Sequence, residues 1–337
     1  MSAIPKCLCL HTAACSNYMA LSTQQILPLI AAIFWLTGQP LYAQRLPRME
    51  WGFQNDNDLY LFNRQDQYYT NGLVLTVSKA ADSTALASHE SNRIWSVYAG
   101  QKLYNAYTGQ IHSISEVDRP ITAYLFAGIS RSAYYTKASM LTYSVELGTI
   151  GRRAFGQQTQ EAVHRALHLY AIAGWQYQLN NAFGADIRTE YAKQLYRTSR
   201  HWFDLTWHAS GTLGLNHTNL GTAASFRIGR LNPISVSAYF SSRLQARPHT
   251  VANELFLYYK PEVNWIGYDA TIQGGIFLDD KGPVARRPAR WTMAHQAGLV
   301  YAQKAFTCSL QYRFSTREVP TMYFRHQYGS LAISYRY

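Results

Sequence analysis

We expect this chain to fold as an all-β protein, a transmembrane antiparallel β-barrel of about 12 strands with one short helix in an extracellular loop. After residue 44, apolar and polar residues alternate repeatedly, as they do in strands that face lipid on one side and water on the other. No apolar run in this part of the chain is long enough for a spanning helix. The 26 Tyr, 14 Phe and 8 Trp suit the aromatic girdles at the two membrane interfaces.

The segment before residue 44 has the features of a secretory leader. Residues 26–38 form an apolar run of signal-peptide length, and cleavage after Ala43 fits the small residue found at such sites. We therefore predict a signal peptide over residues 1–43 and an outer-membrane β-barrel domain over residues 44–337. A transmembrane anchor is the alternative, but the run is shorter than the roughly 20 residues that a spanning helix needs.

Twelve segments are predicted as strands from their alternation. They are residues 48–57, 70–79, 92–104, 121–133, 138–150, 183–196, 203–216, 220–230, 252–269, 290–303, 306–316 and 327–337. Residues 233–243 also alternate, and there we expect either a protruding hairpin or an extra strand. A periplasmic β-sandwich would alternate in the same way. The leader and the aromatic residues at the strand ends favour the barrel.

The charge balance favours an anionic partner. Lys and Arg number 31 against 19 Asp and Glu, which gives a formal net charge of +12. Such an excess is typical of proteins that meet nucleic acid or an anionic lipid surface. Because the basic residues do not form runs and the segments between them alternate, we expect a membrane surface and no nucleic acid.

An acidic cluster connects the first two predicted strands. Residues 55–58 read Asn-Asp-Asn-Asp, and Asp66 follows before the second strand begins. Two carboxylates and two amides within four residues suit calcium, which takes six to eight oxygen ligands. An ordinary polar turn is the alternative, because Asn and Asp are common turn formers. Magnesium also prefers oxygen ligands, whereas zinc favours softer ones.

The period changes between the fifth and sixth predicted strands. Residues 157–168 do not alternate and favour a helix, on which Gln160, His164 and His168 are spaced by four residues and share one face. Glu161 and Arg165 are expected to form an ion pair on the neighbouring face.

The acidic hairpin and the helix are expected at the same rim of the barrel. If both termini are periplasmic, the first and fifth connections both open on the extracellular side. Asp56 and Thr70 share the polar face of their strands, so a carboxylate, a hydroxyl and the His164 imidazole are expected to converge at the inner rim. A solvated surface histidine is the alternative interpretation of His164.

The order and spacing of these motifs resemble those of the outer-membrane lipid A 3′-O-deacylases. The matching segments are Asn55 to Asp58, Asp66 with Tyr69 to Leu73, Asp118-Arg119-Pro120, Glu146 to Gly151, Gln160 to His164 and Gly174-Trp175. The resemblance implies a twelve-stranded barrel of the bacterial outer membrane, with its helix against the outer wall. It also implies calcium-dependent hydrolysis of an ester-linked acyl chain of lipopolysaccharide. We expect a monomer whose site faces lipid A at the extracellular rim.

The resemblance also implies roles for individual residues. His164 would act as general base on a water, and calcium near Asp56 and Asp58 would polarise the ester carbonyl and stabilise the oxyanion. Gln160 would hold the imidazole or a substrate oxygen. Asn55 and Thr70 would orient ligands and water.

Two positions depart from the family pattern. The family's acidic residue six positions after the histidine is Tyr170 here, which cannot replace a carboxylate as a ligand or as a partner of histidine. The family's lysine is not evident before Asp118; His112 lies nearby and Lys102 further upstream. The alternative function is therefore a barrel without catalysis, which binds lipopolysaccharide or serves as a structural or pore protein.

Overall fold

The structure is a computed structural model that describes residues 47–61, 66–245 and 252–337. The predicted signal peptide over residues 1–43 lies outside the described residues. Within the ranges described, no helix combines the length and the apolar character needed to cross a membrane.

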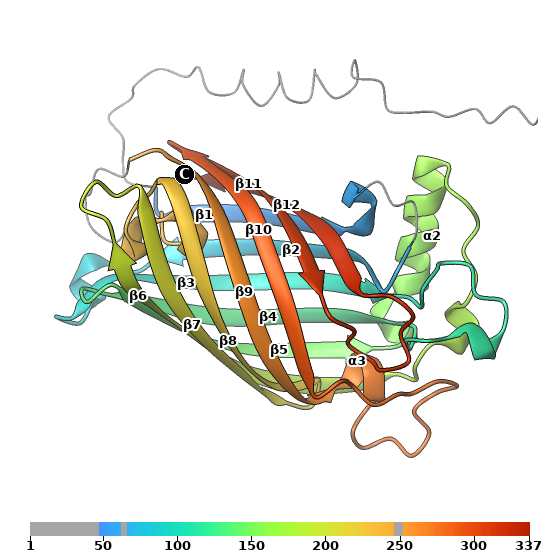
Figure 1. Ribbon diagram of the computed structural model, residues 1–337. Coiled ribbons are helices and arrows are strands. Elements are labelled where there is room, and N and C mark those ends of the chain that lie inside the picture. Colours follow the sequence, from blue (N-terminus) through green and yellow to red (C-terminus); the bar gives the residue numbers. More distant parts are fainter. Residues whose placement is uncertain (1–46, 62–65, 246–251) are drawn as a thin grey trace, which may run out of the picture. The chain divides into compact units, whose positions relative to one another are not determined.

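Twelve antiparallel strands form one closed barrel (Figure 1). The strands are β1 (Met49–Asn57), β2 (Tyr69–Ala80), β3 (Glu90–Tyr104), β4 (Thr122–Tyr135), β5 (Ser139–Ile150), β6 (Ala182–Arg197), β7 (Phe203–Gly214), β8 (His217–Arg230), β9 (Glu254–Asp269), β10 (Trp291–Gln303), β11 (Phe306–Ser315) and β12 (His326–Arg336). All twelve predicted strands are present, and each ends within three residues of its expected bounds. The prediction of a twelve-stranded barrel is therefore confirmed.

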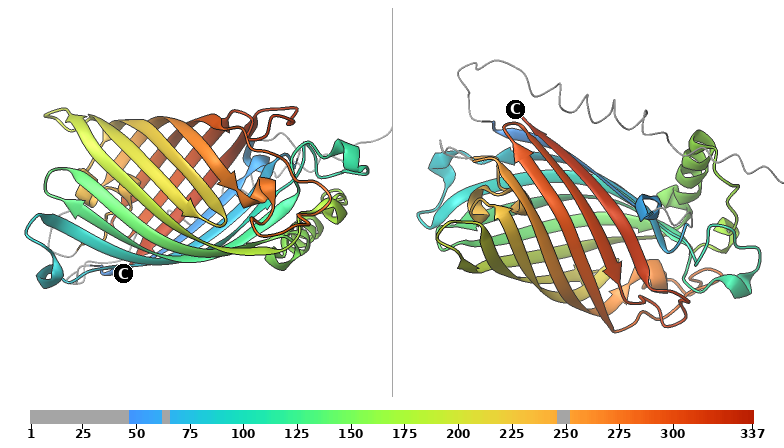
Figure 2. Two further views of the ribbon diagram at one scale, coloured as in Figure 1. Left: turned by 90° about the horizontal axis from the view of Figure 1, so that it is seen from below. Right: turned by 45° about the horizontal axis from the view of Figure 1, so that its top comes forward.

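The ring closes where β1 pairs with β12. At this seam the guanidinium of Arg336 donates to Glu50 Oε2 over 2.6 Å, and the indole of Trp51 donates to the hydroxyl of Tyr337 over 2.9 Å. The C-terminus and the largest helix lie at opposite ends of the barrel (Figure 2). We call the end that carries this helix the α2 end.

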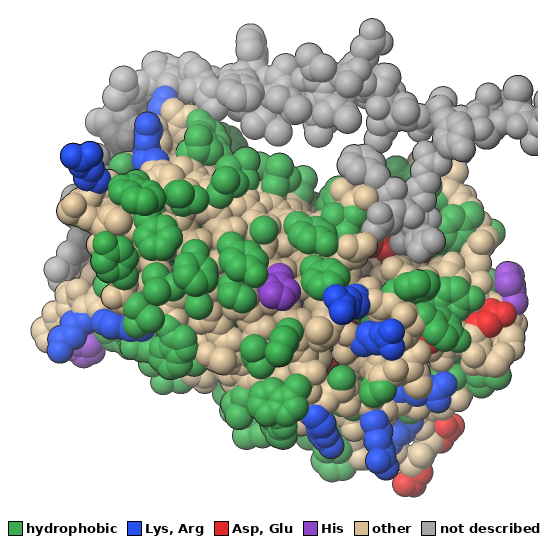
Figure 3. All heavy atoms as spheres, viewed as in Figure 1, with side chains coloured by type: hydrophobic (Ala, Val, Ile, Leu, Met, Phe, Trp, Pro, Cys, Tyr) green, Lys and Arg blue, Asp and Glu red, His purple; other side chains and the backbone are tan. Residues whose placement is uncertain are grey.

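Side chains alternate between the lumen and the outer wall, as predicted. On β7, Asp204 and Thr206 are buried inside the barrel, whereas Trp207 and Leu213 are exposed on its outer wall. Apolar side chains are spread over the face formed by β9 to β11 (Figure 3). A closed ring with an apolar outer face is the arrangement of a membrane barrel.

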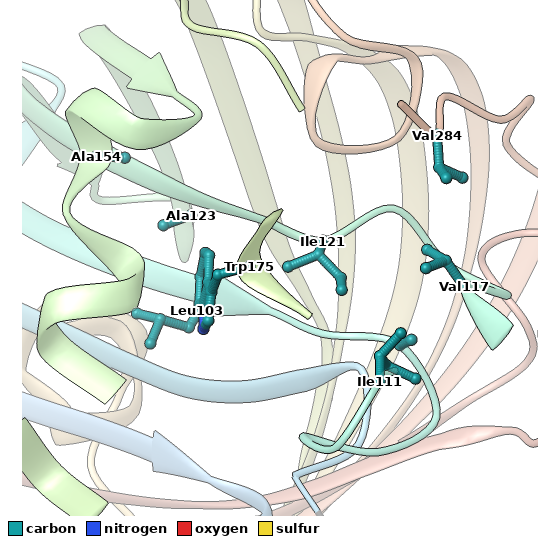
Figure 4. Close-up of a cluster of buried hydrophobic side chains, with 9 residues drawn as sticks. Leu103, Ile111, Val117, Ile121, Ala123, Ala154, Trp175 and Val284 are labelled. Carbon is teal, nitrogen blue, oxygen red and sulfur yellow. The ribbon is translucent and has the colours of Figure 1, made fainter. Parts of the chain in front are cut away.

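The predicted helix is α2 (Gly156–Leu167), and it lies against the outer wall of the barrel as the resemblance implied. Leu103 of β3 and Ala123 of β4 pack beneath it with Trp175 (Figure 4). Gly156 permits this close approach, since a Cβ there would lie 2.4 Å from the Trp175 ring and 2.5 Å from Ala123 Cβ. The expected ion pair between Glu161 and Arg165 is present, with a separation of 3.8 Å on the exposed side of the helix.

Short segments fold into both ends of the lumen. At the α2 end, the single helical turn α3 (Ala270–Gln273) packs Ala270 against inward-facing side chains of β4. The sequence analysis missed α3, because one turn is too short to show a helical period. At the opposite end, the segment after β8 folds inward as two 3-10 turns, η6 (Ile234–Val236) and η7 (Ala238–Phe240).

The expectation of a hairpin or an extra strand over residues 233–243 was therefore wrong. Ile234 and Phe240 pack among inward-facing residues of β2 to β6, in a cluster that also includes Leu244. The apolar residues of this segment are thus buried inside the barrel end, whereas alternation on a strand would have placed them on its wall.

Candidate active site

Both nitrogen atoms of His164 are held by contacts that α2 and the segment after it create. His164 and Gln160 lie one turn apart on the buried face of α2 and are only 5% and 4% exposed. His164 Nδ1 lies 2.8 Å from the carbonyl oxygen of Tyr170, and Nε2 lies 2.8 Å from Asp66 Oδ2. A carbonyl oxygen can only accept, so Nδ1 carries a proton, and the 2.8 Å contact of Nε2 with a carboxylate oxygen requires a further proton between those two atoms. His168, expected on the same face, ends the helix and is exposed.

Asp66 comes from the connection between β1 and β2 and receives a second donor. The hydroxyl of Tyr170 donates to the same oxygen, Asp66 Oδ2, and the rings of Tyr170 and His164 meet edge to face. Burial raises the pKa of the Tyr170 hydroxyl, and the charge of Asp66 raises it further. The hydroxyl therefore remains a hydrogen-bond donor at neutral pH. Gly109 leaves the space for this contact, since a Cβ there would lie 2.6 Å from the Tyr170 hydroxyl.

Asp58 is a buried carboxyl group near Asp66, which is itself partly exposed. Asp58 is 4% exposed, and its Oδ2 accepts from the backbone amide of Gln67 over 2.8 Å. Burial raises the pKa of the Asp58 carboxyl to about 8, the Gln67 amide works against this, and the charge of Asp66 adds to the rise. A bound cation would compensate these two carboxylates. This part of the predicted site therefore fits a hard, oxygen-ligated metal ion.

Among the described His, Cys, Asp and Glu side chains, one group of three has ligand atoms within 4.8 Å of one another. It consists of Glu146, Asp186 and His217, and neither Asp56 nor Asp58 belongs to it. A cation at the acidic hairpin would therefore need backbone, amide or water oxygens in addition to the carboxylates, as calcium commonly uses.

Asp56 faces the lumen, as its position in β1 predicted. The Tyr69 hydroxyl donates to Asp56 Oδ2 over 2.8 Å, and Gln54 Nε2 donates to Oδ1 over 2.9 Å. Across the sheet Asp56 is opposite Gly72 of β2, and Gly72 is opposite Lys102 of β3. Lys102 is therefore a basic residue of the lumen, on the second strand from Asp56.

Lys102 is the site candidate that the sequence analysis left unassigned. Its ammonium group lies 5.4 Å from the centre of the inward-facing Phe126 ring. The signal that would have found it is parity, because Lys102 shares the inward face of residues 92–104 with Tyr98 and Tyr104.

Asn55 lies on the other face of β1, with the lipid-facing residues. Its Nδ2 donates to Asn71 Oδ1 over 3.1 Å and to the Gly72 carbonyl over 3.0 Å, and its Oδ1 accepts from the Tyr60 hydroxyl over 2.7 Å. These contacts join the end of β1 to the start of β2 and to the turn that follows β1.

Two buried polar groups of the predicted site have no hydrogen-bond partner among the described residues. One is Thr70 Oγ1, at a β-bulge where the register between β2 and β3 shifts. The other is Gln160 Nε2, whose partner oxygen Oε1 accepts from the Trp175 indole over 2.8 Å. Leaving a buried polar group unpaired costs about 1–3 kcal/mol. Such groups are frequently satisfied by a ligand or an ordered water.

The structure thus brings some of the predicted residues together and separates others. Gln160 and His164 share the buried face of α2, and the acidic hairpin reaches His164 at the same end of the barrel. The carboxylate in contact with the imidazole is that of Asp66, whereas Asp56 is turned into the lumen and Asn55 onto the outer face of β1.

A family model and a solved outer-membrane structure both match most of the chain. A family model described as outer membrane protein LpxR matches residues 29–337. The solved structure of LpxR from Salmonella typhimurium superposes with a TM-score of 0.67 at 17% identity, over 86% of this chain and 100% of that chain. At this identity the likeness concerns the fold alone.

Other solved barrels are less similar to this chain. The beta domain of the Bordetella autotransporter Brka gives a TM-score of 0.41 at 12% identity, over 87% of this chain and 98% of that chain. No curated protein matches the chain in sequence.

Proposed function

The chain belongs to the LpxR family of outer membrane proteins, and from this premise we propose that it is a calcium-dependent lipid A deacylase of the 3′-O-deacylase type. It would be a carboxylic ester hydrolase that removes an ester-linked acyl chain from lipopolysaccharide. In this proposal the α2 end faces the outside of the cell, where lipid A occupies the outer leaflet, and the protein acts as a monomer. The observation that supports it most directly is the contact between His164 Nε2 and Asp66 Oδ2.

His164 is proposed as the general base. Its Nδ1 proton is fixed by the Tyr170 carbonyl, so Nε2 is the nitrogen that can accept a proton from water. A water entering beside Nε2 would displace Asp66 Oδ2 as it loses its proton. The hydroxide would add to the ester carbonyl while Asp66 stabilises the imidazolium, and the Nε2 proton would then pass to the alkoxide that leaves as the ester C–O bond breaks. The contact in the structure is the arrangement expected when the pair holds this proton.

Asp66 supplies the carboxylate that the helix lacks. The family pattern has an acidic residue where this chain has Tyr170, and the sequence alone made this a reason to doubt catalysis. In the structure the Tyr170 hydroxyl is bound to Asp66 Oδ2, beside the imidazole. We propose that Tyr170 positions Asp66 and that Asp66 acts in place of the missing acidic residue.

Calcium is proposed to bind at the acidic hairpin. Asp56 and Asp58 are the ligands expected from the sequence, and the raised pKa of Asp58 together with the nearby carboxylate of Asp66 supports a cation at this point. When bound, calcium would supply charge that polarises the ester carbonyl and stabilises the oxyanion.

The remaining residues are proposed to orient the reactants. Thr70 Oγ1 and Gln160 Nε2 are free to bind the water or a substrate oxygen, since neither has a hydrogen-bond partner within the described part of the chain. Asn55 would hold the two strand ends in place. Lys102 is proposed as the family's oxyanion-assisting lysine, because it shares the lumen face with Asp56.

The test is mass spectrometry of lipid A from a host with fully acylated lipid A that expresses the protein. Wild type is expected to remove one or two acyl chains in calcium and none in chelator, and His164→Ala is expected to remove none. His168→Ala is the matched control, because this exposed histidine lies one helical turn away and should keep full activity. Unchanged lipid A from folded wild-type protein in the outer membrane would support the alternative, a barrel that binds lipopolysaccharide without catalysis.

A further inference from the structure

A groove of about 530 Å³ opens on the outer wall of the barrel at the α2 end, and we call it the rim groove. It is lined by Val263, Trp291, Met293, Thr316, Arg317 and Arg325. Three of these residues belong to the wall itself, one on β9 and two at the start of β10. Trp291 and Met293 expose 67% and 55% of their surface, which is a large apolar area for side chains at the edge of a membrane.

The upper edge of the rim groove is built by the connection between β11 and β12. The amide of Thr316 donates to the Met293 carbonyl over 2.9 Å, and Thr316 Oγ1 accepts from the Met293 amide over 3.0 Å. This pair keeps the start of the connection attached to β10, so the next residue, Arg317, lies over the apolar wall. Arg325 ends the same connection and lies 5.7 Å from the centre of the Phe314 ring.

Neither Arg317 nor Arg325 is neutralised by a carboxylate within the described ranges, and both side chains are exposed. The neighbouring acid, Glu318, is already paired with Arg119 over 3.2 Å and with His326 over 3.4 Å. Lys and Arg side chains gather on this end of the wall, as Figure 3 shows. Two guanidinium groups without counter-charges at the mouth of an apolar groove would attract an anion.

The wall beneath the rim groove carries aromatic rings whose polar atoms are hydrogen-bonded to each other. The rings of Tyr259 and His295 stack with centres 6.0 Å apart, and the Tyr259 hydroxyl lies 2.7 Å from His295 Nδ1. Because these polar atoms bind each other, the surface that they present is suited to acyl chains. Rings with an apolar body and a polar tip are typical of the membrane interface.

We propose that the rim groove binds a second lipopolysaccharide molecule, apart from the substrate. One acyl chain would lie against Trp291 and Met293, and a lipid A phosphate would be bound by Arg317 and Arg325. Guanidinium groups suit this role because they bind phosphate oxygens in pairs. The proposal rests on the proposed function in one respect, the orientation that places the α2 end in the outer leaflet.

The rim groove and the His164 site are separate positions on the barrel. The groove is lined by β9, β10 and the connection from β11 to β12, whereas α2 packs on β3 and β4, and strands β1 and β2 intervene. One barrel can therefore bind a lipid at each position. The bound lipid at the groove would remain unmodified and would hold the rim at a fixed depth in the membrane.

Native mass spectrometry of the purified barrel, with defined lipid A added, would count the bound molecules. The experiment uses His164→Ala protein, so that the lipid is not altered. We expect one lipid A fewer on the Arg317→Ser/Arg325→Ser variant than on its parent, with at least a tenfold weaker apparent affinity for the lost molecule. Lipid A without phosphates should bind the two proteins equally.

The control is Arg200→Ser/Arg230→Ser, which removes two exposed arginines from the opposite end of the barrel and should leave the count unchanged. If the double variant does not fold, Arg317→Lys/Arg325→Lys keeps the charges and should weaken binding by a smaller factor. Equal counts for the parent and the rim variants would overturn the proposal, as would binding that does not depend on phosphate. The difference of one lipid is independent of whether the His164 site binds or cleaves its substrate.

Discussion

His164 Nε2 lies 2.8 Å from Asp66 Oδ2, although the two residues come from different connections of the barrel. The carboxylate partner of the imidazole is thus provided by the acidic hairpin and not by the helix that carries the histidine. Proton transfer at this site therefore depends on both connections.

Replacing Asp66 by Asn should lower the deacylation rate by about 100-fold, at the lower end of what a positioned acid or base contributes. The amide cannot take up the Nε2 proton or stabilise the imidazolium. Initial rates on lipid A in detergent would measure this. Asp82→Asn is the control, since that carboxylate is 73% exposed and pairs with Arg48 on the surface. A rate for Asp66→Asn within twofold of wild type would remove Asp66 from the mechanism.

Tyr170→Phe should lower the rate by about tenfold, because Asp66 loses the hydroxyl that donates to it while the ring remains. A second experiment moves the carboxylate from position 66 to position 170. Tyr170→Glu alone should reduce the rate further, since two carboxylates would then be adjacent. Combined with Asp66→Asn, the same glutamate should restore part of the activity. If the combination is no better than Asp66→Asn alone, the two positions are not interchangeable.

The Asp58 carboxyl should make folding stability depend on pH. Its pKa rises from 3.8 to about 8 on folding, so the folded state keeps a proton that the unfolded chain loses. The stability that Asp58 contributes is present at low pH and is lost as the pH rises from about 4 to about 8. Asp58→Asn should remove this slope. The measurement is the unfolding temperature at each pH, taken from the change in electrophoretic mobility when the heated barrel unfolds.

Calcium should restore the folding stability that the wild-type protein loses at high pH. A cation that binds the ionised Asp58 releases its proton, so added calcium should raise the unfolding temperature more at pH 8 than at pH 5. Asp58→Asn should show a smaller rise at both values. A calcium effect of the same size in wild type and variant would place the ion elsewhere.

The lumen should stay closed unless the segment after β8 is released. Arg227 binds Asp204 through two bonds of 2.9 and 2.6 Å and donates to Ser237 Oγ over 2.7 Å, and it is fully buried. Arg227→Met leaves Asp204 buried without its charged partner, with only the amide of Gln194 still donating to it among the described side chains, which should cost about 3–5 kcal/mol. Arg227→Met/Asp204→Asn should recover part of this loss. In planar bilayers Arg227→Met should conduct and wild type should not. Steady conductance by wild type would favour the pore alternative.

The strands could be predicted from the sequence because the alternation of apolar and polar residues within each strand shows which side chains face lipid and which face the lumen. Alternation is local, so Asp204 and Thr206 could be assigned to the lumen from their neighbours alone. The helix could also be predicted, because a change of the hydrophobic period from 2 to 3.6 residues can be detected within a segment of about three helical turns.

Contacts between distant connections were beyond that reasoning. Asp66 was noticed as part of a motif, but only the folded connections show that it meets His164 and Tyr170. The segment around Ile234 alternates like a strand, and nothing local distinguishes burial inside the barrel from burial in its wall. Lys102 could have been assigned to the lumen from the sequence, because it alternates in step with the inward-facing residues of β3.

The seam between β1 and β12 has a consequence for the order of assembly. Eleven strand pairs join neighbours in sequence, whereas Arg336 and Glu50 at the seam are 286 residues apart. Closure therefore has to wait for the last strand, and contacts of such high sequence separation are slow to form. A chain cut before β12 would leave unpaired edges on β1 and β11, which are templates for aggregation. Substitutions at Arg336 should thus reduce the yield of assembled barrel while leaving the turnover of each assembled molecule unchanged.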